Sequence, residues 1–193
     1  MRNWRKRTPS GWHRRRPAGR RERIIVLGII GLFALLAYFK GVTGCQPFWL
    51  GAPPAVVAGP ATVIDGDSIS IAGWPVRLQG IDAPEWEQTC TDASGKTWAC
   101  GRAAARELAT LVRGKHLTCK PRDFDQYKRV LAVCSLPDGT DVSGWLVQQG
   151  WAVVFGHSSA YAAAEAEAKA AKRGLWAGTF MRPSEWRERQ AEQ

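Results

Sequence analysis

The sequence predicts an α+β domain, a small five-stranded β-barrel with three packed helices, preceded by an N-terminal transmembrane or signal-anchor helix. Two observations support this prediction. In the body of the chain, short apolar or alternating segments come first and helical segments are interspersed later, which is typical of a small antiparallel barrel that carries helices. Before the body, a strongly basic stretch leads into a continuous apolar run.

The positive charge of the chain is concentrated at its N-terminus. The 193 residues carry a net charge of +10, and residues 1–23 contain ten Lys and Arg against a single acid, Glu22, which accounts for +9 of that total. The rest of the chain is therefore almost neutral. A function in nucleic-acid binding cannot rest on the net charge and has to come from a local site.

The apolar run covers residues 24–39 and contains sixteen residues between Arg23 and Lys40. A basic segment before an apolar run predicts a membrane anchor with a cytoplasmic N-terminus and a periplasmic or extracellular domain in a bacterium. A cleaved signal peptide and acylation of Cys45, which ends the lipoprotein-like stretch VTGC, are the alternatives. The predicted organisation is a basic tail (1–23), an anchor (24–44), a Pro/Gly/Ala linker (45–60), the folded domain (61–181) and a C-terminal tail (182–193).

The folded domain divides into strand-like and helical segments in a clear order. Strands alternate in polarity and are bounded by turn residues, whereas the helical segments are rich in Ala and Leu and end at glycine. Asp141 is the expected N-cap of the second helix. Five strands are expected at 61–64, 68–71, 75–81, 115–119 and 130–136, with a short extended piece at 151–155, and helices at 101–114, 141–150 and 159–174, which together resemble an OB-fold-like barrel.

Four cysteines lie in the folded domain: Cys90, Cys100, Cys119 and Cys134. An even number in a domain placed outside the cytoplasm predicts two disulfides, and the sequence alone allows three pairings. Pairing of the first two would close a short loop, and pairing of the last two would join two strand-like segments. Free thiols are the alternative, while the spacing excludes a zinc site because no C-x-x-C motif is present.

Five motifs together resemble the staphylococcal nuclease (thermonuclease) family. They are ATVIDGDSISI, VRLQGIDAPE, DQYKRVLA, WLVQQGWA and AKRGLW, and they follow the order and spacing of that family from Ala61 to Trp176. The resemblance implies an OB-type five-stranded barrel with three helices. It also implies a Ca²⁺-dependent nuclease that hydrolyses phosphodiester bonds in DNA and RNA and leaves 3′-phosphates.

Two aspartates of these motifs indicate a metal site. Asp67 and Asp82 would repel each other unless a cation lies between them, and a hard cation such as Ca²⁺ prefers carboxylate and carbonyl oxygens. The resemblance implies that these two residues bind calcium and that the main-chain carbonyl of Ala83 adds a ligand. The family commonly has threonine at the position of Ala83.

The same motifs supply the predicted catalytic residues. Arg77 lies in a strand, where an arginine needs a carboxylate or phosphate partner, and its planar fork suits two phosphate oxygens. The resemblance implies that Arg77 and Arg129 stabilise the charge of the transition state and that Glu85 is the general base for water. Lys128 stands where the family has glycine, beside the substrate.

The predicted partners follow from these residues. Tyr127 is expected to stack on a nucleotide base, which tolerates any base, so single-stranded DNA and RNA are the expected substrates of a monomeric enzyme. The alternative is a non-catalytic OB-fold module that binds nucleic acid or protein at the membrane. A binding module has no physical need for the whole charged set, which favours the enzyme: Asp67, Arg77, Asp82, Glu85 and Arg129.

Overall fold

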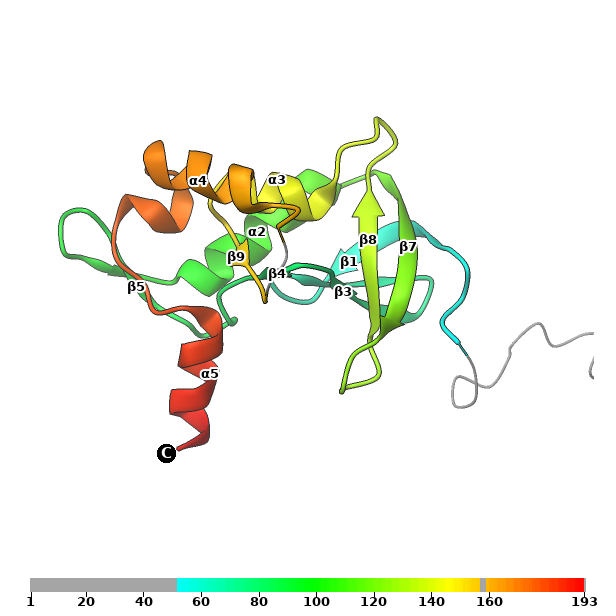
Figure 1. Ribbon diagram of the computed structural model, residues 1–193, viewed down its shortest axis with the longest axis horizontal. Coiled ribbons are helices and arrows are strands. Elements are labelled where there is room, and N and C mark those ends of the chain that lie inside the picture. The colour runs from blue at the N-terminus through cyan, green and yellow to red at the C-terminus, as the bar shows by residue number, and fades with distance from the viewer. Residues whose placement is uncertain (1–51, 157–158, 193) are drawn as a thin grey trace, which may run out of the picture. The chain divides into compact units, whose positions relative to one another are not determined.

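The structure, a computed structural model, describes residues 52–156 and 159–192 (Figure 1). Residues 52–193 form a compact unit that contains the folded domain. The predicted basic tail and anchor lie outside the described residues. Within the described ranges, no helix is long and apolar enough to span a membrane.

The core of the domain is a closed five-stranded barrel, as predicted. Its strands are joined in the order β1-β2-β3-β8-β7, and all neighbours are antiparallel except β3 and β8, which run parallel. Two short ladders lie beside the barrel, one between β4 and β9 and one between β5 and β6. The strands are β1 (Val57–Val63), β2 (Ser68–Ile71), β3 (Trp74–Leu78), β4 (Ile81–Asp82), β5 (Cys90–Thr91), β6 (Thr97–Trp98), β7 (His116–Phe124), β8 (Val130–Ser135) and β9 (Val153–Val154).

The three predicted helices are present and cover one side of the barrel (Figure 1). They are α2 (Cys100–Val112), α3 (Val142–Gln148) and α4 (Ala162–Ala170). Asp141 caps α3 as predicted, because its Oδ1 accepts the N–H groups of Ser143 and Gly144 at 2.9 and 3.2 Å. Leu108, Leu111 and Val112 of α2 are buried in the apolar core against the inward side chains of the barrel.

Both disulfides join the pairs that the sequence analysis singled out. Cys119 and Cys134 face each other directly across β7 and β8. Cys90 and Cys100 close the loop that leads from β5 to α2. Both bridges are buried; the first lies within the β7–β8 hairpin that carries Arg129, and the second begins where the segment that carries Glu85 ends.

Three strand predictions were wrong. The strand expected at 75–81 is divided by a turn at 79–80 into β3 and β4, and the other two errors arose because proline and glycine suggested a linker and a loop. The strand β1 begins four residues before the expected boundary at 61, and its first half pairs with β7 through the register Val57↔Cys119 to Pro60↔His116. The strand β7 continues to Phe124 instead of ending at 119. Pro121 is tolerated because the register shifts between Pro121 and Asp123, where a ladder hydrogen bond is lost anyway.

The third helix is shorter than expected, and the C-terminal tail contains another helix. Lys172 has a positive φ of 51°, which ends the helical run before Gly174, and a short 3₁₀ helix, η1 (Gly174–Ala177), follows. The tail 182–193 forms α5 (Pro183–Ala191), with proline at its start where no N–H is needed. Figure 1 shows α5 projecting away from the barrel on the same side as the β7–β8 turn.

Candidate active site

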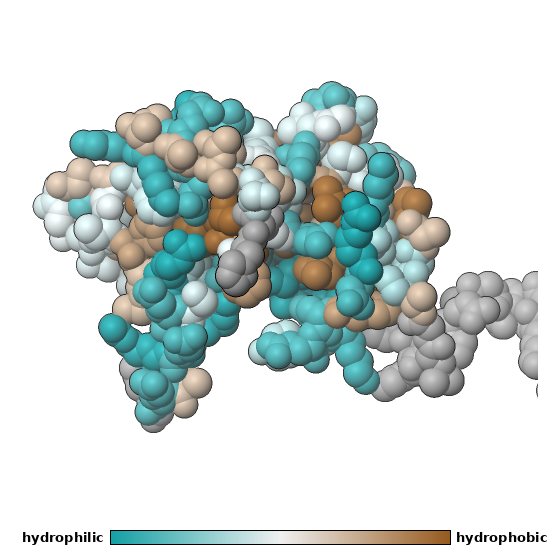
Figure 2. Space-filling model, viewed as in Figure 1, coloured by the Kyte–Doolittle hydropathy of each residue, from teal (hydrophilic) through white to brown (hydrophobic). Residues whose placement is uncertain are grey.

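A cleft of about 1110 Å³ opens at the end of β3 and continues between the β7–β8 turn and α5. Figure 2 shows this face hollowed between those two projections, with hydrophilic side chains on both sides. The cleft carries four arginines and several acids, a lining that suits an anionic polymer. The charged lining residues are Asp65, Arg77, Glu85, Arg122, Asp125, Arg129 and Arg187.

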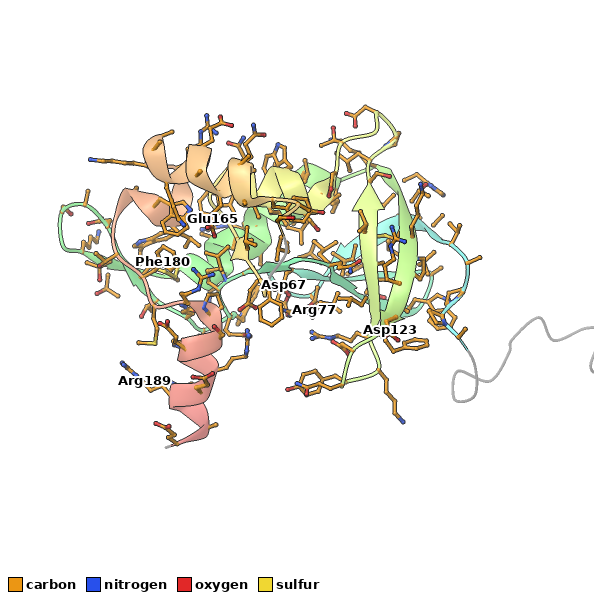
Figure 3. All side chains as sticks on the ribbon, in the orientation of Figure 1. Asp67, Arg77, Asp123, Glu165, Phe180 and Arg189 are labelled. Carbon is orange, nitrogen blue, oxygen red and sulfur yellow. A yellow bond between two sulfur atoms is a disulfide. The ribbon has the colours of Figure 1, made fainter. Side chains whose placement is uncertain are left out.

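A buried charged cluster forms the floor beside this cleft. Arg77 in β3 donates from Nη1 to Asp67 Oδ1 at 2.7 Å and from Nη2 to Asp82 Oδ1 at 2.8 Å. The side chains of Asp67 and Asp82 are only 4% and 2% exposed, and that of Arg77 is 16% exposed. Figure 3 shows Asp67 and Arg77 next to each other at the centre of the domain. The structure thus brings together two predicted metal ligands and one predicted catalytic arginine.

Burial is the largest influence on the pKa of Asp67. Removal from water raises the pKa of this carboxyl to about 7, although the nearby guanidinium of Arg77 acts in the opposite direction. Asp67 is also held by the main-chain N–H of Ala83, which donates to Oδ2 at 2.9 Å. Additional positive charge beside Asp67 would favour its ionised form.

The turn that carries Asp67 is packed tightly against the rest of the site. A Cβ on Gly66 would lie 2.7 Å from the Cβ of Ala83 and 3.1 Å from that of Ala104. Glycine at this position of the DGD motif therefore lets the turn approach both Ala83 and α2. The main chain of Ala83 is consequently held beside the two aspartates, where the sequence placed it.

Glu85 is positioned by the loop that follows β4. Its N–H donates to Oε1 of Gln88 at 3.2 Å, and its carbonyl accepts the N–H of the same residue at 2.8 Å. Gln88 is fully buried and donates from Nε2 to the carbonyl of Met181. Gly101 leaves room for this arrangement, because a Cβ there would lie 1.7 Å from the carbonyl oxygen of Glu85.

Arg129 comes from the β7–β8 turn and is held by local partners. Its Nε donates to Asp125 Oδ2 at 2.7 Å, and its Nη1 donates to the hydroxyl of Ser68 at 3.0 Å. Asp125 also accepts the N–H groups of Tyr127 and Arg129 through Oδ1, both at 2.9 Å. The sequence analysis missed this role of Asp125, although an aspartate that bonds the main chain two residues on is a recognised turn signal.

The two predicted substrate-binding residues differ in position. Tyr127 lines the cleft, is 70% exposed and stacks on Arg129, whose guanidinium carbon lies 5.4 Å from the ring centroid. Lys128 is exposed and is not among the residues that line the cleft. Its φ of 62° is the left-handed conformation in which glycine is favoured, which explains why a lysine is unusual at this turn.

A further arginine, which the sequence analysis did not identify, comes from α5. Arg187 donates from Nη1 to Asp82 Oδ1 at 2.9 Å and to Glu85 Oε1 at 2.6 Å, and from Nη2 to Asp82 Oδ2 at 3.0 Å. Its side chain is 37% exposed, and the two carboxylates raise its pKa against the effect of burial. No sequence signal marks this residue, because it lies about a hundred positions from its partners.

The predicted calcium ligands fit a hard cation in kind. Among residues 52–156 and 159–192, no three His, Cys, Asp or Glu side chains form a group that could hold a metal by themselves. The predicted site needs only the carboxylates of Asp67 and Asp82, a main-chain carbonyl and water. Both carboxylates accept hydrogen bonds from the guanidinium of Arg77, and the main-chain N–H of Ala83 donates to Asp67. Arg187 shares the oxygens of Asp82.

The comparisons with known proteins agree with this geometry. The family model described as staphylococcal nuclease homologue matches residues 75–178, which include every predicted site residue except Asp67. The succinoglycan biosynthesis protein ExoI of Rhizobium meliloti (strain 1021) is 39% identical over 123 residues, which cover 62% of this chain and 64% of that protein.

Two further relatives carry endonuclease names. An uncharacterized endonuclease of Escherichia coli is 32% identical over 135 residues, which cover 66% of this chain and 82% of that protein. The probable endonuclease LCL3 of Candida dubliniensis is 32% identical over 113 residues, which cover 52% and 46% of the two chains. The aligned part thus spans less than two thirds of ExoI and about half of the fungal protein.

The matched residues, the closed barrel and the convergence of the charged motifs on one cleft lead to the same assignment. The chain belongs to the staphylococcal nuclease family, and its folded domain is that of a nuclease, an enzyme that hydrolyses phosphodiester bonds.

Proposed function

We propose that this protein is a membrane-anchored, Ca²⁺-dependent nuclease that hydrolyses DNA and RNA outside the cytoplasm. The observation that supports the proposal most is the convergence of Arg77, Glu85 and Arg129 on the lining of one cleft, next to a buried pair of aspartates. The endonuclease names of the relatives support the same reaction class.

The two arginines bind the phosphate that is attacked. Each guanidinium uses only part of its donor capacity on Asp67, Asp82, Asp125 and Ser68, so further N–H groups are free to bond phosphate oxygens. The attack places additional negative charge on the non-bridging oxygens, and donors that are already fixed by protein partners stabilise it without reorganisation.

Glu85 delivers the nucleophile. Its carboxylate lies on the cleft and accepts a proton from a water molecule that attacks phosphorus in line with the departing 5′ oxygen. The P–O bond to the 5′ oxygen breaks as the new bond forms, the departing 5′ oxygen takes up a proton from solvent to become a hydroxyl, and the other product keeps the phosphate on its 3′ end. The buried contacts of the Glu85 loop with Gln88 and Gly101 hold the main chain of this residue in place.

Asp67, Asp82 and the carbonyl of Ala83 would hold the calcium ion, which would supply positive charge to stabilise the phosphate in the transition state. The geometry supports this assignment, because both aspartates are buried and share the guanidinium of Arg77, which places two carboxylates close to one point. A bound dication favours the ionised carboxylate that ligation requires.

The substrate is a flexible strand whose bases are accessible. The cleft is open at the β7–β8 turn, where the exposed ring of Tyr127 can stack on a base without selecting its identity. Paired bases cannot reach such a ring, so single strands are preferred. Tyr127 would contact only the face of a base, and Arg77 and Arg129 would contact only phosphate. Neither contact distinguishes DNA from RNA.

The proposed location rests on the N-terminal sequence and on the cysteines. The basic segment 1–23 followed by the apolar residues 24–39 favours a membrane anchor with the domain on the far side, and the two disulfides are typical of an oxidising compartment. The protein acts as a monomer in this proposal, since all the groups named for the reaction come from one chain.

A digestion experiment tests the proposed function. The full chain in detergent is incubated with a single-stranded DNA oligonucleotide and with the matching RNA, in Ca²⁺ and in excess chelator. Calcium is expected to permit cleavage of both into products with 3′-phosphates, and the chelator to stop it reversibly. Cleavage that is equally fast in chelator would contradict the metal role, and binding without cleavage would identify a non-catalytic module.

A further inference from the structure

The helix α5 brings a positively charged group to the two carboxylates on which the proposed reaction depends. It lies beyond the residues matched by the family model, which end at 178. Arg187 nevertheless bonds both Asp82, a proposed calcium ligand, and Glu85, the proposed base. The helix therefore adds to the family site a contact that the matched residues do not contain.

The contact leaves little room for another cation on Asp82. A carboxylate oxygen has two lone pairs, and Oδ1 of Asp82 already accepts from Arg77 at 2.8 Å and from Arg187 at 2.9 Å. The second oxygen accepts from Arg187 at 3.0 Å. A dication on the same carboxylate would share it with a guanidinium in a buried setting, where like charges repel strongly.

The remaining attachments of α5 are few. Pro183 is its only buried residue, and the other side chains of the helix are exposed or half-buried. The segment just before it is fixed to the domain, because Arg182 donates to the carbonyl of Val154 and Gln88 donates to the carbonyl of Met181. A nine-residue polar helix of this kind has little stability of its own and can leave the domain about a fixed base.

We propose that Arg187 and the divalent cation are alternative partners of Asp82 and Glu85, so that docking of α5 and binding of the metal exclude each other. The inference rests on the proposed calcium site. When the metal binds, Arg187 gives up both carboxylates, α5 moves away from the cleft and Glu85 becomes free to accept a proton. In low calcium the docked helix keeps the base paired and covers one side of the cleft.

The size of the effect follows from how often α5 is docked. If the docked form makes up about nine tenths of the metal-free protein, the apparent affinity for Ca²⁺ is about tenfold weaker than that of the undocked form. Removing the guanidinium removes this competition. Calcium binding by the Arg187→Gln variant is therefore expected to be about tenfold tighter than that of the unsubstituted chain.

The experiment is a calorimetric titration of the full chain in detergent with CaCl₂ alone. The matched control is Arg189→Gln, which removes the same charge from the same helix at an exposed position. Figure 3 shows Arg189 on the side of α5 turned away from Asp67 and Arg77. Arg187→Lys keeps the charge but cannot bond both oxygens of Asp82 in parallel. Its calcium affinity is therefore expected to lie between that of the unsubstituted chain and that of Arg187→Gln.

Hydrogen exchange supplies a readout that does not depend on affinity. In the unsubstituted chain, saturating Ca²⁺ is expected to accelerate amide exchange in residues 183–191 and to leave the barrel strands unchanged. In Arg187→Gln, exchange in this helix is expected to be fast with and without calcium. Circular dichroism and the exchange of the barrel strands verify that every variant is folded.

The outcomes separate the two proposals. Equal calcium affinity in the unsubstituted chain and in Arg187→Gln, or equal tightening in both glutamine variants, would overturn the competition and leave the proposed nuclease intact. Helix exchange that calcium does not change would overturn it as well. If no variant binds calcium while all remain folded, the proposed metal site fails and the competition fails with it.

Discussion

Two segments of the domain each deliver an arginine to the cleft, and they hold it in different ways. In residues 77–85, Arg77 bonds carboxylates that are almost fully buried and that lie on other turns and strands. In the loop 125–129, Arg129 bonds Asp125, four residues away, and the hydroxyl of Ser68 in β2. The first segment is part of the folded core, whereas the second is a locally closed turn at the surface.

This difference indicates which residues of the site contribute both to catalysis and to the stability of the fold. A change in residues 77–85 leaves buried charges without a partner and therefore affects folding and turnover together. Loss of Arg129 leaves the partly exposed Asp125 and an uncharged hydroxyl, that of Ser68, and is therefore expected to affect turnover more than stability. Equivalent substitutions in the two segments, compared for stability and for cleavage rate, test whether the segments differ in this way.

The largest effect is expected for Arg77→Ala. It removes the shared partner of two buried aspartates, which should lower the free energy of unfolding by about 3–5 kcal/mol. It also removes a donor to the phosphate, which should lower the rate of cleavage by about a thousandfold. Chemical denaturation and single-turnover cleavage measure the two effects. A variant as stable as the unsubstituted chain would show that the aspartates do not depend on Arg77.

Arg129→Ala is the matched change in the loop. The rate of cleavage should fall by about a hundredfold to a thousandfold, because a fixed donor to the transition state is lost. The free energy of unfolding should change by less than about 1 kcal/mol, since the ion pair with Asp125 is local and partly exposed. The same two measurements apply. Destabilisation equal to that of Arg77→Ala would remove the contrast between the segments.

Tyr127→Ala tests the outermost part of the loop. The ring is 70% exposed and contacts Arg129, so its loss should not change stability. The loss of a stacked base should raise KM for a single-stranded oligonucleotide about tenfold, while kcat changes little. Steady-state kinetics measure the split between the two constants. A fall in kcat with an unchanged KM would mean that the ring positions Arg129 instead of binding a base.

The smallest effect is expected for Lys128→Gly. The left-handed φ of 62° strains a lysine and suits glycine, so the substitution should raise the free energy of unfolding by up to about 1 kcal/mol. Thermal and chemical denaturation measure the change. Because Lys128 does not line the cleft, a strong loss of substrate affinity in this variant would contradict its placement in the structure.

The motifs between residues 61 and 136 pointed to most of the groups that the structure brings to the cleft and its floor, but not to Arg122 or Asp125. The motif RLQGIDAPE holds Arg77, Asp82 and Glu85 within nine residues, which was enough to group them, although the single strand expected at 75–81 is divided into β3 and β4. The barrel and the three main helices followed from the same local patterns, and two disulfides were expected, although the sequence alone left three pairings open.

The parts that the sequence could not predict depend on tertiary contacts or on tolerated exceptions. The first half of β1 and the end of β7 contain proline, which the barrel accepts at Pro60 and at the register shift after Pro121. The contact of Arg187 with Asp82 joins residues 105 positions apart through a polar helix that has no apolar face to reveal its docking. Pattern alone contains no information on such a pair.

The central claim is that Glu85 delivers water to phosphorus in this cleft. Its most direct test is cleavage of a single-stranded DNA oligonucleotide by the full chain in Ca²⁺ and ¹⁸O-labelled water, followed by mass analysis of both fragments. The account predicts one labelled oxygen in the 3′-phosphate for each cut and none in the 5′-hydroxyl fragment, with cutting by Glu85→Gln slower by about a hundredfold or more. Label in the 5′-hydroxyl, or cutting by Glu85→Gln at the unsubstituted rate, would contradict it.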